Sequence, residues 1–145
     1  MHQTKKIGEI LAQEALKTKS KSALVFALEG DLGSGKTSFI QGFARGLGIK
    51  ERVLSPTFVL MKRFPVPKNG LRPEPKELYH FDCYRIENEK EILNLGFRKI
   101  ISNPENIVVI EWADRIKKIL PEDSIKIKFG FVDEKTRKIS FFLKG

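Results

Sequence analysis

The feature that most constrains the fold is a short apolar run that passes through a glycine-rich loop directly into a helix. Residues 23–28 are six apolar residues in succession, a pattern typical of a strand buried on both faces in a parallel sheet. Residues 29–35 contain three glycines, and residues 36–47 are predicted to form a helix with one apolar face. A strand, a tight loop and a helix in direct succession indicate an α/β fold.

Periodicities along the rest of the chain predict more strands alternating with helices. The first element is an amphipathic helix for which Thr4 is placed as the N-cap. The later elements are strands at 57–63 and 78–82, a helix at 89–101 broken at Gly96, a strand at 107–110, a helix at 113–119, and strands at 125–131 and 138–143. The prediction is therefore a three-layer α/β fold with a mixed, mainly parallel central sheet and a C-terminal antiparallel hairpin.

Length and composition favour one domain over residues 1–145, the usual size of a single domain. Residues 65–76 hold four of the seven prolines and are predicted to be an exposed loop. A single cysteine, Cys83, excludes an internal disulfide, and two histidines make a histidine-based metal site unexpected. No uncharged apolar run approaches a membrane span, and the charged N-terminus is unlike a signal peptide, so a cytoplasmic protein without a membrane partner is expected.

The chain is basic, with 27 Lys and Arg against 18 Asp and Glu and a net charge of +9. A positive field attracts polyanions such as a nucleotide, tRNA or an acidic partner protein. A solvated lysine-rich surface explains the same excess. Charge alone therefore does not select a ligand.

Residues 30–37 match the phosphate-binding pattern G-x-x-x-x-G-K-[ST] at every required position. Glycines let the backbone approach a phosphate, and the N-terminus of the following helix adds partial positive charge. Lys36 can reach the β- and γ-phosphates, and the Thr37 hydroxyl is placed to coordinate Mg²⁺ between them. The alternative is a glycine-rich turn that matches by chance. The strand and helix around the motif favour binding of a nucleotide with Mg²⁺.

Two predicted strands end in a carboxylate that could serve the same ion. Asp82 ends the strand at 78–82, and Glu111 follows the strand at 107–110. Strand carboxyl ends form the edge where ligands bind in open α/β sheets, although many strands end in a charged residue for no functional reason. No N-K-x-D or D-x-x-G pattern is present to read guanine or its γ-phosphate, so ATP or ADP is favoured over a guanine nucleotide.

Six motifs, in this order and spacing, resemble the TsaE (YjeE-type) family over nearly the whole chain. They are residues 30–37, Ser55-Pro56-Thr57-Phe58, His80-Phe81-Asp82-Cys83-Tyr84-Arg85, Glu91…Leu95-Gly96, Ile110-Glu111-Trp112-Ala113 and Leu120-Pro121. Members of this family are bacterial ATPase subunits of the tRNA adenosine threonylcarbamoyltransferase complex. Two departures are a long proline-rich insert at 65–76 and Cys83, where the family often has an apolar residue.

The resemblance implies a fold like that of P-loop NTPases and a small ATPase needed to make N6-threonylcarbamoyladenosine in tRNAs that read codons beginning with A. It implies TsaD and TsaB type subunits as partners and only weak or indirect contact with tRNA. The implied cofactors are ATP or ADP and Mg²⁺.

The resemblance also implies roles for individual residues. Phosphates would be bound by Leu32, Gly33, Ser34, Gly35, Lys36 and Thr37. Magnesium would be held by Thr37 and Glu111, with Asp82 as a further active-site acid that binds the ion or positions water. Thr57 would face the γ-phosphate in a switch-like segment, Trp112 would pack beside the site, and Thr4 would lie near the adenine. Lys36, Thr57, Asp82 and Glu111 are thus the expected catalytic residues.

Two other classes of protein stay open on sequence alone. A small-molecule kinase would use the same loop but would need an acceptor pocket. A basic nucleic-acid-binding module would keep the nucleotide as a structural element and stack bases on Phe129, Phe131, Phe141 or Phe142, although alternating aromatics are typical of a core. Arg85 and Arg115 follow the two acidic motifs as candidates for charge stabilisation, with surface ion pairs as the alternative for each.

Overall fold

The protein is built around a mixed β-sheet. The structure is a computed structural model, and it describes residues 2–30, 35–53, 60–68, 75, 77–131 and 137–142. Within these residues six strands form one sheet in the order β2-β3-β4-β1-β5-β6. The strands are β1 (Leu24–Gly30), β2 (Met61–Pro65), β3 (Glu77–Asp82), β4 (Asn106–Glu111), β5 (Ile125–Phe131) and β6 (Arg137–Phe142). Strands β3, β4, β1 and β5 are parallel, whereas β2 and β6 are antiparallel at the two edges.

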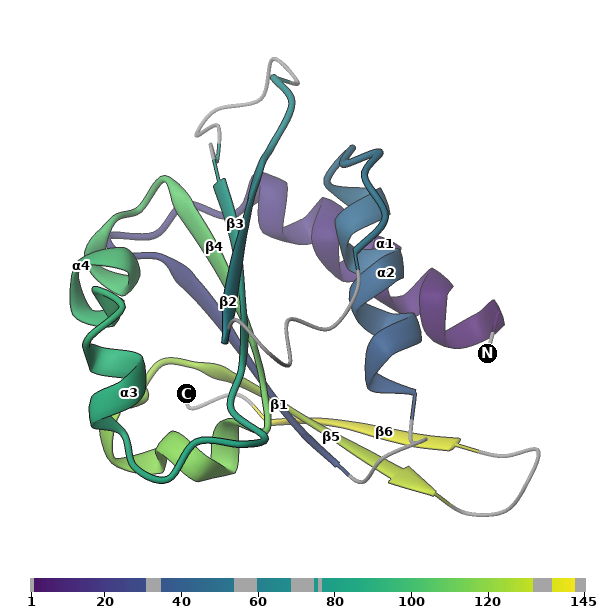
Figure 1. Ribbon diagram of the computed structural model, residues 1–145. Coiled ribbons are helices and arrows are strands. Elements are labelled where there is room, and N and C mark those ends of the chain that lie inside the picture. Colours follow the sequence, from purple (N-terminus) through teal and green to yellow (C-terminus); the bar gives the residue numbers. More distant parts are fainter. Residues whose placement is uncertain are drawn as a thin grey trace.

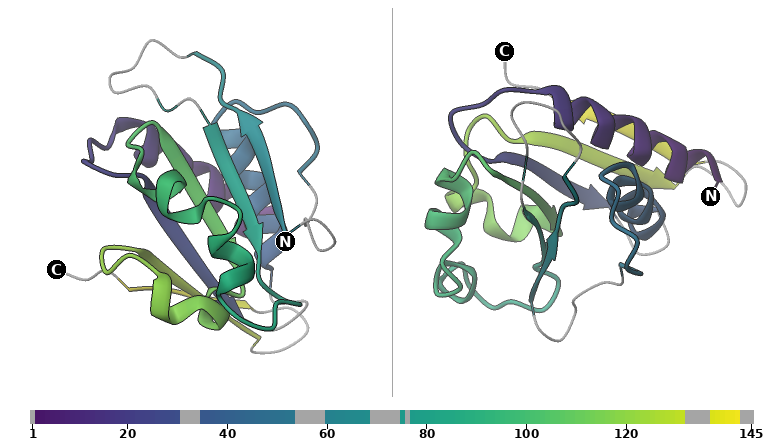
Figure 2. Two further views of the ribbon diagram at one scale, coloured as in Figure 1. Left: turned by 60° about the vertical axis from the view of Figure 1, so that its left-hand side comes forward. Right: turned by 90° about the horizontal axis from the view of Figure 1, so that it is seen from above.

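Helices cover both faces of this sheet (Figure 1 and Figure 2). The long helices α1 (His2–Lys17) and α2 (Lys36–Gly46) pack together on one face. The short helices α3 (Lys90–Leu93) and α4 (Phe97–Ser102) and the 3-10 helix η1 (Ala113–Ile119) lie on the other face. The predicted three-layer α/β fold with its mainly parallel sheet and C-terminal antiparallel pair is thus confirmed.

Alternation along the central strands sorts their side chains into two cores. In β1, Phe26 and Leu28 pack against α1 and α2, whereas Val25 and Ala27 pack against the short helices. All six residues of β4 are buried, as expected for a strand covered on both faces. The buried Phe129 of β5 belongs to the first core, while Phe141 of β6 is 45% exposed.

Glycines bring the two long helices into backbone contact. A Cβ added at Gly42 of α2 would overlap the carbonyl oxygen of Lys5 in α1. Likewise a Cβ on Gly46 would lie 2.6 Å from the carbonyl oxygen of Glu9, and one on Gly8 would overlap that of Phe39. Because no side chain separates the helix backbones at these points, α1 and α2 are held at a fixed, short separation.

Two predictions for the first half of the chain are wrong. Thr4 is not an N-cap, because α1 already begins at His2 and Thr4 is buried within it. The strand predicted at 57–63 begins at Met61, because Leu60 has a φ of +62° that an extended strand cannot contain. Residues 57–59 lie outside the described part of the chain.

The predicted proline-rich loop is only partly loop-like where it is described. Pro65 still belongs to β2, an edge strand in which a missing N–H is tolerated, and Val66 is buried in the core. Pro67 and Lys68 are exposed as predicted. Most of the remainder of 65–76 is outside the described residues.

The helices in the second half of the chain lie close to their predicted positions. Gly96, with a φ of +84°, separates α3 from α4, which confirms the predicted break. The helix predicted at 113–119 forms as a 3-10 helix with a kink at Ile116. Among the helices that the structure describes, none combines the length and the apolar character that a membrane span requires.

Replacement of Gly42 by alanine tests the close packing of α1 and α2. Helix propensity alone would make Gly42→Ala more stable by about 1 kcal/mol. We expect the opposite sign, a loss of about 1–3 kcal/mol in the free energy of unfolding, because the new methyl group must push α1 away. Urea denaturation followed by circular dichroism measures it, with the exposed Gln13→Ala in α1 as the near-neutral control. A Gly42→Ala variant more stable than the wild type would contradict the packing.

Candidate functional site

Three parallel strands end together at one edge of the sheet. Asp82 at the end of β3 is the register partner of Glu111 at the end of β4. On its other side Glu111 is the partner of Leu28, and β1 continues from there to Gly30. The two carboxylates predicted from sequence therefore lie on adjacent strands, beside the strand that leads into the glycine-rich loop.

Strand alternation aims both carboxylates at the face that α2 covers. Leu78 and Val109 belong to the core beneath α1 and α2, and the period of two places Asp82 and Glu111 on the same face as these residues. Both carboxylates are almost fully buried, at 4% exposure each. Buried carboxylates need polar partners, and each has them here.

His80 is one of these partners, and it is a residue for which the sequence suggested no role. Its Nε2 lies 2.8 Å from Oε2 of Glu111, in a contact that both residues bury. The Nδ1 atom of His80 is buried without a hydrogen-bond partner. The tautomer with its proton on Nε2 therefore fits this environment, because it donates to Glu111 and leaves no buried N–H unpaired. His80 thus holds one oxygen of Glu111 in place.

The turn after β3 orients Asp82. The backbone N–H of Tyr84 donates to Oδ1 of Asp82 over 2.9 Å, while the N–H of Cys83 donates to the carbonyl oxygen of Glu111 over 3.0 Å. A further backbone bond, from the N–H of Asp82 to the carbonyl oxygen of Leu60, ties the start of β2 to this turn. Backbone groups of two neighbouring segments therefore fix the position of the carboxylate.

Lys36 is buried at the first position of α2, with only 5% of its surface exposed. Its Nζ donates to the carbonyl oxygen of Gly30 over 2.5 Å and lies 3.7 Å from the centre of the Trp112 ring. An ammonium over an indole face is a favourable cation–π arrangement. Lys36 and Trp112, predicted separately from two motifs, are thus brought into contact.

Trp112 follows Glu111 directly and adopts a left-handed backbone conformation, with a φ of +57°. Such a conformation is costly for a bulky side chain, and residues of this kind cluster at functional sites. The ring centre lies 4.9 Å from that of Tyr84, and the guanidinium carbon of Arg115 lies 5.6 Å from the indole. Of the two candidate arginines, both of which are exposed, Arg115 is therefore placed beside the two aromatic rings.

The other predicted residues are distributed as follows. Gly35 precedes α2 with a φ of +103°, a conformation that favours glycine, and Thr37 is exposed in the first turn of α2. Thr4 is buried within α1. Leu32, Gly33, Ser34 and Thr57 lie outside the described residues.

Cys83 is a small buried side chain, as predicted, with no exposed surface. Burial raises the pKa of its thiol to about 12, and the neighbouring carboxylates of Asp82 and Asp114 act in the same direction. The thiol is therefore protonated at neutral pH, the form that is a poor nucleophile.

These residues fit a nucleotide with Mg²⁺ better than a metal ion held by protein alone. Among the described residues, no three His, Cys, Asp or Glu side chains form a metal-binding group. Magnesium in nucleotide sites takes one or two protein ligands and completes its shell with water and phosphate oxygens. Two adjacent carboxylates, with the exposed Thr37 hydroxyl and a buried lysine at the start of α2, suit that arrangement.

Fold and site together define an α/β protein with paired carboxylates and a buried lysine at the carboxyl edge of a mainly parallel sheet. The family profile described as "Threonylcarbamoyl adenosine biosynthesis protein TsaE" matches residues 1–139. The chain belongs to the TsaE family.

Individual relatives agree with this assignment. The chain is 38% identical over 143 residues to a Bacillus subtilis protein, covering 99% of this chain and 81% of the relative. It is 35% identical over 129 residues to a Haemophilus influenzae protein, covering 89% and 77%. Both relatives are named tRNA threonylcarbamoyladenosine biosynthesis protein TsaE. The crystal structure of YdiB from B. subtilis superposes with a TM-score of 0.69 at 32% identity, covering 99% of this chain and 80% of that one.

Replacement of His80 tests the buried contact with Glu111. His80→Leu removes the donor and leaves a buried carboxylate oxygen without it, so we expect a loss of about 1–3 kcal/mol in the free energy of unfolding. His80→Gln keeps an N–H donor and should recover part of that loss. Urea denaturation of both variants gives the comparison. Equal stability of the leucine variant and the wild type would show that the contact contributes nothing.

Proposed function

We propose that this protein is the ATP-binding and slowly hydrolysing subunit that supports formation of N6-threonylcarbamoyladenosine in tRNAs reading codons that begin with A. Membership of the TsaE family and the names of its relatives support the pathway. They also favour this function over a small-molecule kinase. The observation that supports the nucleotide part is that Asp82 and Glu111 end the adjacent strands β3 and β4, while Lys36 binds the carbonyl oxygen of Gly30 at the end of the neighbouring β1.

Lys36 is the residue that we assign to the β- and γ-phosphates. Its contacts with Gly30 and Trp112 keep its ammonium beside the end of β1. When a nucleotide binds, the ammonium would donate to phosphate oxygens in place of the Gly30 carbonyl oxygen. Backbone N–H groups of residues 32–37, with the N-terminus of α2, would bind the same phosphates. Trp112 would line the site, and Thr4 would lie toward the adenine.

Thr37 and Glu111 are the residues that would hold Mg²⁺, with Asp82 beside them to bind the ion or its water. Bound magnesium would neutralise phosphate charge and orient the terminal phosphoryl group. His80 restrains Glu111, and the Tyr84 N–H restrains Asp82, so both carboxylates are preoriented. Such preorientation lowers the reorganisation needed when charge develops.

Hydrolysis at this site requires no covalent nucleophile from the protein. The two carboxylates would orient water, and Thr57 would face the γ-phosphate from its switch-like segment. The guanidinium carbon of Arg115 lies 5.5 Å from the Tyr84 ring and 5.6 Å from the Trp112 ring, farther from the indole than the ammonium of Lys36, so Arg115 is placed against ring faces. We therefore assign slow hydrolysis to the chain alone and faster turnover to its complex with TsaD and TsaB type subunits.

Replacement of Lys36 tests nucleotide binding. Lys36→Ala should abolish binding of Mg·ATP and of ADP, because it removes the lysine that, in this pattern, binds the β- and γ-phosphates. Isothermal calorimetry measures the affinity, and the far-ultraviolet spectrum checks that the fold is kept. The matched control is Lys99→Ala, which removes an exposed lysine from α4 on the opposite face of the sheet. Unchanged affinity in Lys36→Ala would refute the nucleotide site.

The hydrolysis rate tests the accessory role. We expect the isolated chain to turn over ATP well below the roughly 1–100 per second of typical kinases, and we expect TsaD and TsaB type subunits to raise the rate. Phosphate release measured with and without the purified subunits makes the comparison. A kinase-like rate for the chain alone would contradict the proposal.

A further inference from the structure

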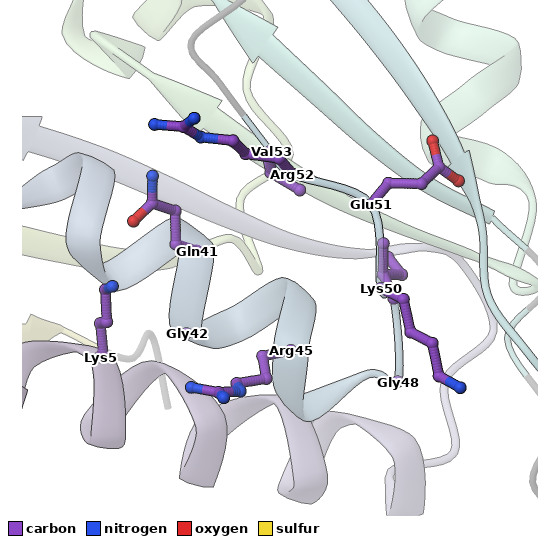
Figure 3. Close-up of a pocket in the computed structure, with 10 residues that line it drawn as sticks. Lys5, Gln41, Gly42, Arg45, Gly48, Lys50, Glu51, Arg52 and Val53 are labelled. Carbon is purple, nitrogen blue, oxygen red and sulfur yellow. The ribbon is translucent and has the colours of Figure 1, made fainter.

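A basic hollow of about 660 Å³ lies beside α2, and one of its lining residues, Lys5, directly follows Thr4 in α1 (Figure 3). Three segments surround it, which are α1, α2 and the connector formed by residues 48–53. Its charged and amide side chains are Lys5, Gln41, Arg45, Lys50, Glu51 and Arg52. Four of these carry positive charge and one carries negative charge.

Rigid backbone forms the walls of this hollow. Gly42 holds α1 directly against α2 on one side. On the other side Gly48, with a φ of +86°, turns the chain back along α2, and buried Ile49 and Val53 anchor both ends of the returning connector. The three residues between these anchors are exposed. The charges at 50–52 are therefore carried on a fixed frame.

Two arginines face the same side of the hollow. Figure 3 shows Arg45 and Arg52 extending in one direction across α2 with Lys5 and Gln41 beside them, whereas Lys50 and Glu51 point the opposite way. Arg45 already lies 3.7 Å from a carboxylate oxygen of Glu9, and 76% of its side chain is exposed. An exposed pair of this kind is weak and can exchange its carboxylate for one from a partner.

We propose that this hollow is a docking site for an acidic segment of a protein partner, which places carboxylates between Arg45 and Arg52. The inference rests on the proposed function, which names TsaD and TsaB type subunits as the partners of this chain. Arginine side chains bind carboxylates through two parallel hydrogen bonds, and a mainly positive surface selects and orients a negatively charged partner.

The lining favours a protein over a nucleic acid. Nucleic-acid grooves combine a row of cations that follows the phosphate backbone with aromatic side chains that stack on bases. Among the residues that the structure describes, the lining of this hollow includes no aromatic side chain. Its cations surround one depression, and Glu51 at its rim would repel a phosphate chain. A protein partner can satisfy both the arginines and the glutamate.

The test compares two variants with the same change in net charge. The first is Arg45→Glu/Arg52→Glu in the hollow, and the control is Lys117→Glu/Lys118→Glu, which reverses two exposed lysines of η1 on the opposite face. Affinity for purified TsaD and TsaB type subunits is measured with an ATP analogue present, and affinity for tRNA alone is measured separately. Calorimetry with ATP confirms that the nucleotide site of each variant is intact. Arg52→Glu alone replaces the double variant if that variant does not fold.

We expect the hollow variant to bind the subunits at least tenfold more weakly than the wild type, with a reduced dependence on salt, and the control to change little. Equal loss in both double variants, no loss in either, or loss of tRNA affinity alone would each overturn the docking site. If the wild type binds ATP but none of the subunits, the proposed partnership fails together with the docking site. If the wild type binds the subunits and the hollow variant binds them equally, only the docking site fails.

Discussion

The parallel pairing of β3, β4 and β1 is the constraint on which the rest of the site depends. In-register pairing makes Asp82 and Glu111 neighbours and places both beside the strand that enters the glycine-rich loop. Parallel neighbours have to be joined by crossovers, so the helices that cover the two faces of the sheet follow from the same pairing. With both carboxylates buried, His80 and the backbone of Tyr84 supply the polar partners that burial requires.

The contact between α1 and α2 has a similar role on one face of the molecule. Glycines at 8, 42 and 46 remove the side chains that would separate the two helices. Since α2 begins at Lys36, the position of the buried lysine depends on how α2 is seated against α1 and the sheet. The same close approach forms one wall of the basic hollow, so the candidate site and the proposed docking surface depend on one packing interaction.

Helices, strands and strand-end carboxylates could be predicted from short stretches of the sequence, whereas contacts between residues on different strands could not. The strand β1 and the helix α2 that begins at Lys36 follow from composition and periodicity, as do the carboxylates that end β3 and β4. The contact between His80 and Glu111 joins residues 31 positions apart and depends on strand register, which one sequence does not reveal. The prediction of Thr4 as an N-cap is wrong because α1 begins at His2 and Thr4 is buried within it. No sequence pattern indicated the left-handed conformation of Leu60, after which β2 begins.

The single cysteine of the chain has a practical consequence. Cys83 has no exposed surface, and its thiol pKa of about 12 leaves almost no thiolate at neutral pH. The native thiol should therefore react little with thiol reagents while the protein is folded. A cysteine introduced at an exposed position can then carry a dye or spin label as the sole reactive thiol. Distances between helices, or between this chain and a bound partner, can then be followed in solution without first removing a native residue.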